Sequence, residues 1–183
     1  MKTALLAVLL AAAGAAAAAA AATKMNLTFK GPEGWRRRDY SNAGGADPVV
    51  KFEKGADSIT VRQYGAKGSF YRAPEQFMSG PAATTMGKTP DFLGRIKVAG
   101  GDVEVYKREF PISTLDPHSA SSAPERMGSE TFCVLPAASD GRFAVLSWSR
   151  ESPIPDAHDR GEKAWLAFLK TVAPAVTPKT KNP

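Results

Sequence analysis

Residues 130–149 read Glu-Thr-Phe-Cys-Val-Leu-Pro-Ala-Ala-Ser-Asp-Gly-Arg-Phe-Ala-Val-Leu-Ser-Trp-Ser. The dipeptide Asp140-Gly141 separates two strand patterns, 130–136 and 142–149. Asp-Gly in this position predicts an antiparallel hairpin with a type I′ turn, because both residues tolerate the positive φ angles which that turn needs. Both patterns carry apolar residues at successive positions, which is typical of strands covered on both faces. We therefore expect these two strands to lie at the centre of a sheet.

Six further strand patterns precede this hairpin in the sequence. Turn residues separate several of them, as at 54–57 (Lys-Gly-Ala-Asp) and 100–102 (Gly-Gly-Asp), which is typical of hairpins. Ile59 and Val61 alternate with polar residues, which predicts a strand with one face toward water. The six predicted strands span residues 26–30, 35–40, 49–53, 58–64, 95–99 and 103–110.

The C-terminal part of the chain predicts a helix over residues 156–172. Its apolar residues recur at steps of three and four, so we expect Trp165, Phe168 and Leu169 to dock the helix on the sheet. A proline begins a shorter helical turn over residues 74–78, a position where helices tolerate it. Strands predominate, so the expected fold class is α+β, a mainly antiparallel sheet with a C-terminal helix and a short internal helix packed on it.

The first 22 residues have the layout of a secretory signal peptide. Lys2 gives a positive start, and an apolar stretch and an alanine run follow it. A retained membrane anchor is the alternative, because the apolar length approaches the roughly 20 residues of a membrane span. Alanine is only weakly apolar, so cleavage near Ala22 is favoured, and no stable transmembrane anchor is then left. The chain is predicted to be secreted or periplasmic, with a signal peptide over 1–22, a single domain over 23–173 and a flexible Pro-rich tail over 174–183.

The single cysteine excludes a scaffold built on intramolecular disulfides. Cys133 lies within the strand pattern 131–135, Thr-Phe-Cys-Val-Leu, and no histidine is near it in the sequence. These neighbours indicate a small core residue rather than a reactive thiol.

The order of the predicted elements can be followed through short motifs. Residues 29–35 read Phe-Lys-Gly-Pro-Glu-Gly-Trp, and the hairpin 49–64 and the step Ala-Pro-Glu-Gln-Phe at 73–77 follow. The aromatic-rich hairpin 130–149 and the helix 156–172 close the domain. This order resembles PsbP-like domains, the α/β/α sandwiches related to the extrinsic subunit of photosystem II. The resemblance implies an architecture and a non-catalytic binding or assembly role, and it carries over no metal-binding residue.

Residues suited to catalysis are few. The Gly-x-Ser-x-Gly string of nucleophile-elbow hydrolases does not occur. His118 lies in the loop 113–124, which is rich in Ser and Pro, and His158 lies near the start of the predicted helix, so solvation and capping account for both histidines. Two separated histidines and one cysteine do not give the closely spaced ligands of a zinc site. The sequence therefore predicts no catalytic residue, no metal site and no cofactor.

Basic residues give the clearest indication of a binding site. Without Lys2 the chain keeps 23 of its 24 basic residues against 18 acidic ones, a net charge of +5. On a strand, Arg36 and Arg38 point to the same face. Two guanidiniums beside the indole of Trp35 are suited to a phosphate, a carboxylate or a sugar acid. The alternative is that these are solvated strand residues paired with nearby acidic side chains. Trp35, Arg36 and Arg38 are the candidate binding residues.

Together these features predict an exported, non-catalytic binding or accessory module of the cell envelope. Its expected partner is an unknown envelope protein or an anionic small ligand. Nucleic acid is not an expected partner, because the aromatic residues do not alternate with a basic stripe. Two alternatives remain open: a small secreted hydrolase with a loop-assembled site involving His118, and a structural envelope protein that oligomerises.

Overall fold

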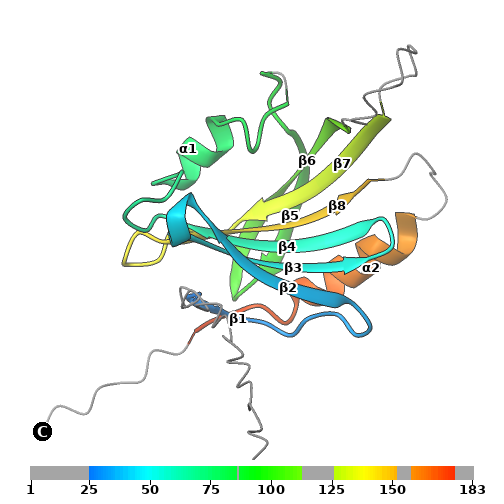
Figure 1. Ribbon diagram of the computed structural model, residues 1–183, viewed down its shortest axis with the longest axis horizontal. Helices are drawn as coiled ribbons and strands as arrows, with labels where there is room; N and C mark the ends of the chain where they lie inside the picture. Colours follow the sequence, from blue (N-terminus) through cyan, green and yellow to red (C-terminus); the bar gives the residue numbers. More distant parts are fainter. Residues whose placement is uncertain (1–24, 86, 113–125, 152–157, 176–183) are drawn as a thin grey trace, which may run out of the picture.

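The computed structural model describes residues 25–85, 87–112, 126–151 and 158–175 (Figure 1). Within these ranges the chain forms nine strands, two α-helices and one 3-10 turn. The elements are β1 (Leu27–Thr28), β2 (Arg36–Asn42), η1 (Ala43–Gly45), β3 (Asp47–Lys54), β4 (Asp57–Tyr64), α1 (Pro74–Ser79), β5 (Asp91–Val98), β6 (Gly101–Ile112), β7 (Arg126–Val134), β8 (Phe143–Arg150), α2 (His158–Leu169) and β9 (Ala173–Pro174).

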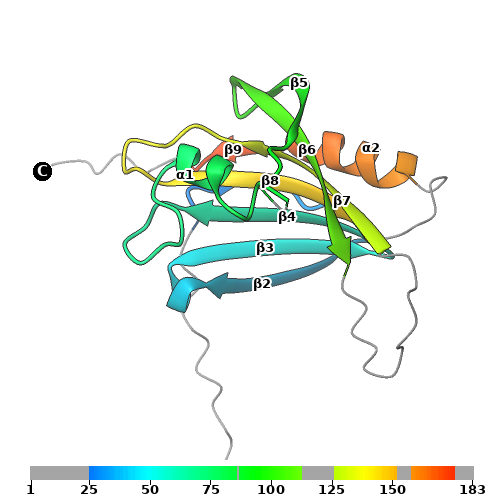
Figure 2. The same cartoon turned by 90° about the horizontal axis from the view of Figure 1, so that it is seen from above.

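Seven strands form one antiparallel sheet in the order β2-β3-β4-β8-β7-β6-β5. Figure 2 shows them side by side in this order, from β2 at the bottom of the view to β5 at the top. The prediction for the 130–149 hairpin is confirmed, since β8 is the central strand and β7 is its neighbour. The hairpin β3–β4 also lies at the predicted turn, where Lys54 pairs with Asp57. The mainly antiparallel sheet is therefore confirmed.

The turn between β7 and β8 differs from the predicted type I′ turn. Among the described non-glycine residues only Ala43 and Ala99 have a positive φ, so Asp140 does not. The amide of Gly141 donates to the carbonyl of Ala138, so the β-turn covers residues 138–141 and Gly141 takes its last position. The prediction of the hairpin was right and that of the turn type was wrong. Strand β7 already ends at Val134 and β8 begins only at Phe143, so the connecting loop is longer than the two residues of a type I′ hairpin.

Helix α2 covers one face of the sheet, as predicted. Trp165, Phe168 and Leu169 are each 2% exposed and pack with sheet residues that include Ile59 and Leu146. Figure 1 shows α2 and α1 on opposite faces of the sheet. The described helices include none that is long and apolar enough to span a membrane.

The start of α2 approaches the sheet at a glycine. A Cβ atom on Gly161 would lie 2.5 Å from Oδ1 of Asp57 and 2.7 Å from Nε1 of Trp148. That indole nitrogen donates a hydrogen bond to the same Asp57 oxygen, at 3.1 Å. Only glycine therefore allows the helix to sit this close to β4 and β8.

A second hydrophobic cluster covers part of the opposite face. Phe77 of α1 packs there with Tyr64, Phe132, Phe143 and Val145. Along β8 the residues of this cluster alternate with residues that face α2. The central strands are thus covered on both faces, as their sequence predicted.

A two-stranded ribbon joins the two ends of the described chain. Strand β1 pairs with β9, and the amide of Ala175 donates to the carbonyl of Asn26 at 2.8 Å. Phe29 lies just after β1 and packs against the hydrophobic core under α2. This ribbon closes the α2 side of the sheet next to strand β2.

Cys133 is fully buried and free, so its predicted place in the core is confirmed. Burial raises the pKa of its thiol to about 12. Because the thiolate is the reactive form, we expect the native protein to resist modification by DTNB at pH 8. The same protein in denaturant should release one equivalent of chromophore per chain. Rapid stoichiometric modification of the native protein would contradict this placement.

Candidate functional site

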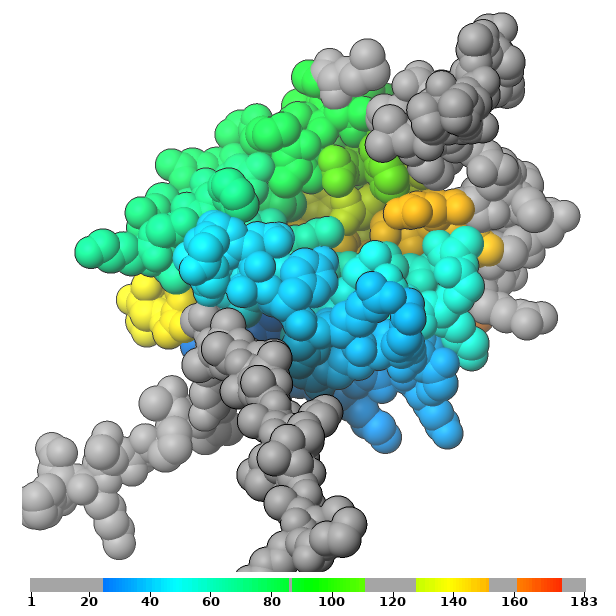
Figure 3. Space-filling model, viewed as in Figure 1, coloured from blue at the N-terminus to red at the C-terminus, as the bar shows by residue number. Residues whose placement is uncertain are grey.

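The sheet face opposite α2 has an apolar part where α1 covers it, and Tyr40 and Phe110 also lie on this face. The remainder carries charged and hydroxyl side chains, which we call the polar face. In Figure 3 this side of the molecule is hollowed between the green surface of α1 to β6 and the blue and cyan surface of β2 to β4. The polar face consists of Arg36, Arg38, Lys51, Glu53, Ser58, Thr60, Arg62, Arg108, Glu130, Ser147 and Ser149.

One row of the polar face crosses six adjacent strands. Each member is the direct cross-strand partner of the next, so all six side chains leave the sheet on the same side. The order of residue types in the row is symmetric and is the same when read from either end: arginine, glutamate, serine, serine, glutamate and arginine. In spatial order its members are Arg36, Glu53, Ser58, Ser149, Glu130 and Arg108.

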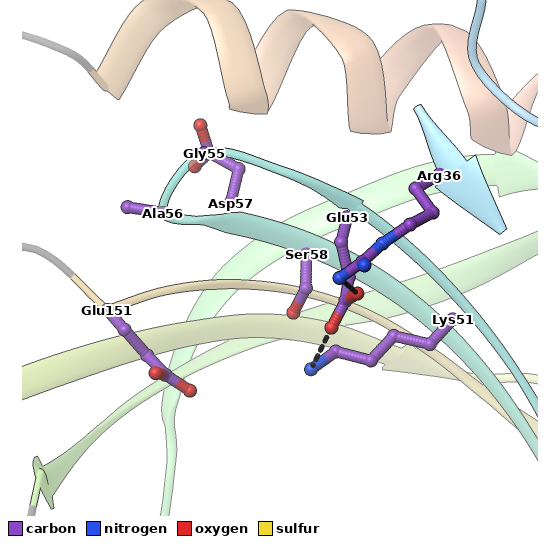
Figure 4. A pocket seen from close by; sticks show the side chains of 8 residues that line it. All are labelled: Arg36, Lys51, Glu53, Gly55, Ala56, Asp57, Ser58 and Glu151. Atoms are coloured by element: carbon purple, nitrogen blue, oxygen red, sulfur yellow. Dashed lines mark hydrogen bonds and ion pairs between the residues drawn. The ribbon is translucent and has the colours of Figure 1, made fainter. Parts of the chain in front are cut away.

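The first charge cluster surrounds Glu53. Its carboxylate lies 2.7 Å from Arg36, 3.1 Å from Arg38 and 3.2 Å from Lys51. Figure 4 shows the Arg36 and Lys51 side chains pointing toward this carboxylate. The hydrogen bond from Arg36 is the largest cause that holds the pKa of Glu53 below its usual value, followed by the bond from Lys51. One carboxylate thus faces three cations.

The second charge cluster surrounds Glu130, whose side chain is 6% exposed. Arg108 donates to one of its oxygens through Nε at 2.8 Å and Nη2 at 2.5 Å. Arg62 lies 3.4 Å from the other oxygen and also donates to the hydroxyl of Ser147 at 3.3 Å. Burial alone would raise the pKa of Glu130, but the charges of Arg62 and Arg108 outweigh it and keep this pKa low. Glu130 is therefore a buried carboxylate held ionised by two arginines.

Hydroxyl groups separate the two charge clusters. Ser58 and Ser149 pair across β4 and β8, and their hydroxyl oxygens are 2.7 Å apart. Thr60 and Ser147 form the next pair and lie deeper, at 2% and 1% exposure. A hydroxyl both donates and accepts hydrogen bonds, so this part of the face suits a neutral polar group.

A pocket of about 500 Å³ opens beside the first charge cluster (Figure 4). Exposed Glu151, the residue after β8, stands at its rim and adds one negative charge. The lining residues are Arg36, Lys51, Glu53, Gly55, Ala56, Asp57, Ser58 and Glu151.

The structure brings together two of the three predicted binding residues. Arg36 and Arg38 both contact Glu53, on the same face as their spacing indicated. Trp35 instead packs against the hydrophobic core under α2. Arg37 also faces this core, and its guanidinium lies 6.0 Å from the centroid of the Phe52 ring. The indole is therefore not beside the two guanidiniums on the polar face.

Five charged residues of the polar face escaped the sequence analysis: Lys51, Glu53, Arg62, Arg108 and Glu130. The spacing of two residues between Lys51 and Glu53 was a usable signal, because it places both on one face of a strand. No local signal links Arg62 with Glu130, since they meet only through the neighbouring strands β4, β8 and β7.

Of the two histidines, only His158 lies in the part of the chain that the structure describes. His118 lies outside the described residues, and so does the loop 113–124. His158 begins α2, on the far face of the sheet from the polar face. In the part of the chain that the structure describes, no group of three or more His, Cys, Asp or Glu side chains is placed to hold a metal ion.

Comparison of the chain with protein-family models and with curated proteins gave no match. The function is therefore inferred from the geometry and charges of the polar face.

Proposed function

We propose that the protein is an exported, non-catalytic binding module of the cell envelope and that its polar face binds an anionic ligand. The observation that carries the proposal is the excess of positive charge on this face. Five cationic side chains, those of Arg36, Arg38, Lys51, Arg62 and Arg108, stand against the carboxylates of Glu53 and Glu130. The other lining carboxylate, Asp57, is paired with Arg150, and with the rim carboxylate of Glu151 counted two positive charges are still uncompensated.

The placement of Arg38 and Lys51 supports this proposal. They are direct cross-strand partners, and like charges in such a position destabilise a sheet. The carboxylate of Glu53 contacts both of them and Arg36 as well, but its single negative charge can compensate only one of the positive charges. An anion bound above this pair would relieve the remaining repulsion, which gives binding a favourable electrostatic contribution.

Partial burial of the cations adds to this support. Side-chain exposure is 30% for Lys51, 29% for Arg62 and 19% for Arg108. Charges that are partly removed from water interact more strongly with an incoming anion than fully solvated charges do. The guanidinium fork also offers paired donors that match a carboxylate or a phosphate.

The envelope location rests on the leader of the sequence and on the net charge of +5 that follows its removal. We assign the fold to the α+β class, because α1 and α2 each supply core residues on their own face of the sheet. The resemblance of the sequence to PsbP-like domains, in which a non-catalytic role is usual, also supports the proposal.

Neutralising the two exposed arginines of the first charge cluster is expected to weaken binding of polygalacturonate, a polymer of a sugar acid. The variant Arg36→Gln/Arg38→Gln should lose about tenfold in affinity at low ionic strength, or about 1.4 kcal/mol. Arg36 and Arg38 are 65% and 54% exposed, so the fold should tolerate both changes, with a thermal midpoint near that of the wild type.

The matched control is Lys163→Gln/Lys170→Gln, which removes the same charge from exposed positions of α2 and the residue after it. This control should bind as the wild type does. The variant Glu151→Gln should bind more tightly, because it removes a negative charge from the pocket rim. Equal weakening by both double variants would show non-specific attraction and would contradict a site on the polar face.

A further inference from the structure

A second pocket lies on the α2 side of the sheet, away from the polar face. It has a volume of about 250 Å³ and opens between the β1–β9 ribbon, the turn that joins β5 to β6 and the loop between β7 and β8. Leu27, Val98, Leu135 and Ala144 line it, and all four pack in the hydrophobic core under α2. Its walls are therefore mainly apolar.

Gln63 of β4 brings a polar group to this apolar pocket. The residue lines the pocket and is only 3% exposed. The backbone amide of Asn26 donates to the side-chain oxygen of Gln63 at 3.2 Å, which fixes the orientation of the carboxamide. Within the described chain the side-chain nitrogen of Gln63 makes no hydrogen bond. Two N–H donors of a buried residue thus lack an acceptor, and a ligand that supplies one would remove the cost of leaving them unpaired.

The charges at the rim of the pocket cancel. Arg142 lines the pocket, and its Nε donates to Asp140 at 2.8 Å. The Asp140 carboxylate also accepts from the backbone amide of Arg142 and from the side chain of Asn26. The bond from that backbone amide is the largest cause that keeps the pKa of Asp140 below its usual value, so the carboxylate is ionised at neutral pH. The rim therefore carries one charge of each sign, which favours a neutral ligand.

We propose that the Gln63 pocket binds a small neutral molecule with an apolar body and one carbonyl oxygen, which accepts hydrogen bonds from the side-chain nitrogen of Gln63. A carbonyl has two lone pairs for the two N–H donors and brings no donor of its own. A hydroxyl group would add a donor that needs a partner among apolar walls, and a carboxylate would add a charge. This site is separate from the anion site of the polar face.

The volume of the pocket limits the apolar body. A dry apolar cavity of about 150 Å³ is large enough for benzene. The volume of about 250 Å³ therefore suits one ring with a short substituent. Acetophenone has this size and one carbonyl oxygen. Isopropylbenzene has the same shape without the oxygen, so the two molecules form a matched pair of probes.

Titration of the isotope-labelled mature protein with each probe, followed by 1H-15N correlation spectra, tests the proposal. Acetophenone should shift the amides of Gln63, Leu135 and Ala144 in a saturable way. In Gln63→Met, which keeps the size of the side chain, its affinity should fall at least about fivefold because the hydrogen bond is lost. The affinity for isopropylbenzene should stay the same or rise, since its binding needs no donor.

Ala144→Val is the second variant and needs no change at Gln63. It adds two methyl groups to a residue of the pocket wall, and valine suits a β-strand. It should weaken both probes at least about fivefold, with a thermal midpoint near that of the wild type.

Three results would overturn the proposal. One is the absence of saturable shifts at the pocket amides with acetophenone. Another is equal weakening of both probes by Gln63→Met, which would give Gln63 a structural role only. The third is movement of the pocket amides when the free protein is concentrated, which would show that a second copy fills the pocket. The anion site of the polar face is tested separately by the arginine variants.

Discussion

Phe168→Ala is expected to lower the free energy of unfolding by about 3–5 kcal/mol, the range for loss of a buried phenylalanine. Phe168 is 2% exposed at the centre of the contact between α2 and the sheet. Its ring centroid lies 5.7 Å from that of Phe29 and 5.8 Å from that of Phe52. Alanine would leave a cavity where three aromatic rings meet. Urea denaturation followed by tryptophan fluorescence measures the change.

The control for Phe168 lies on the same helix. Leu166 is 39% exposed, so Leu166→Ala should change the free energy of unfolding by less than about 1 kcal/mol. Similar losses in the two variants would show that helix propensity rather than burial decides the effect. That result would contradict docking of α2 through Phe168.

Glu130→Gln is expected to destabilise the fold by about 2–4 kcal/mol. The substitution keeps the shape of the side chain but leaves Arg62 and Arg108 without the carboxylate that both now contact. Breaking a buried ion pair on one side typically costs 3–5 kcal/mol, and the partial exposure of the two arginines lowers this range. Glu109→Gln on the exposed side of β6 is the control and should lie within about 0.5 kcal/mol of the wild type.

The pH dependence of the same pair gives a second check. The pKa of Glu130 is lower in the folded protein than in the unfolded chain, where it is about 4.3. Its ionised form therefore stabilises the fold above the unfolded pKa, and this contribution is lost as pH falls through the folded pKa. The stability difference between the wild type and Glu130→Gln should shrink from pH 7 toward pH 3. A difference independent of pH would show that Glu130 acts only through packing.

Local patterns predicted much of the fold. The turn residues at 54–57 located the hairpin of β3 and β4, and the apolar run around Cys133 identified the central hairpin, because these patterns depend only on neighbours along the chain. The steps of three and four in α2 likewise predicted its buried face. The turn type at Asp140 was not predictable, since it depends on where the two paired strands end.

The site required information that the local sequence does not hold. Arg36 and Arg38 stood out because they lie two residues apart in a basic stretch, but their shared partner Glu53 depends on the register between β2 and β3. The contact of Arg62 with Glu130 exists because β8 inserts beside β4, although β5 is next along the chain. The alternation of strand faces separates Trp35 from the arginines, and the hydrophobic core beneath α2 partly buries its side chain.

The central claim, that the polar face binds an anionic ligand, can be tested most directly residue by residue. Titration of isotope-labelled protein with trigalacturonate, followed by 1H-15N correlation spectra, reports each backbone amide. Shifts are predicted at Glu53, Ser58, Glu130 and Ser149, in the row that joins the two charge clusters. The amides of α2, on the opposite face, should stay unchanged. Absent shifts, or shifts centred on α2, would contradict the claim.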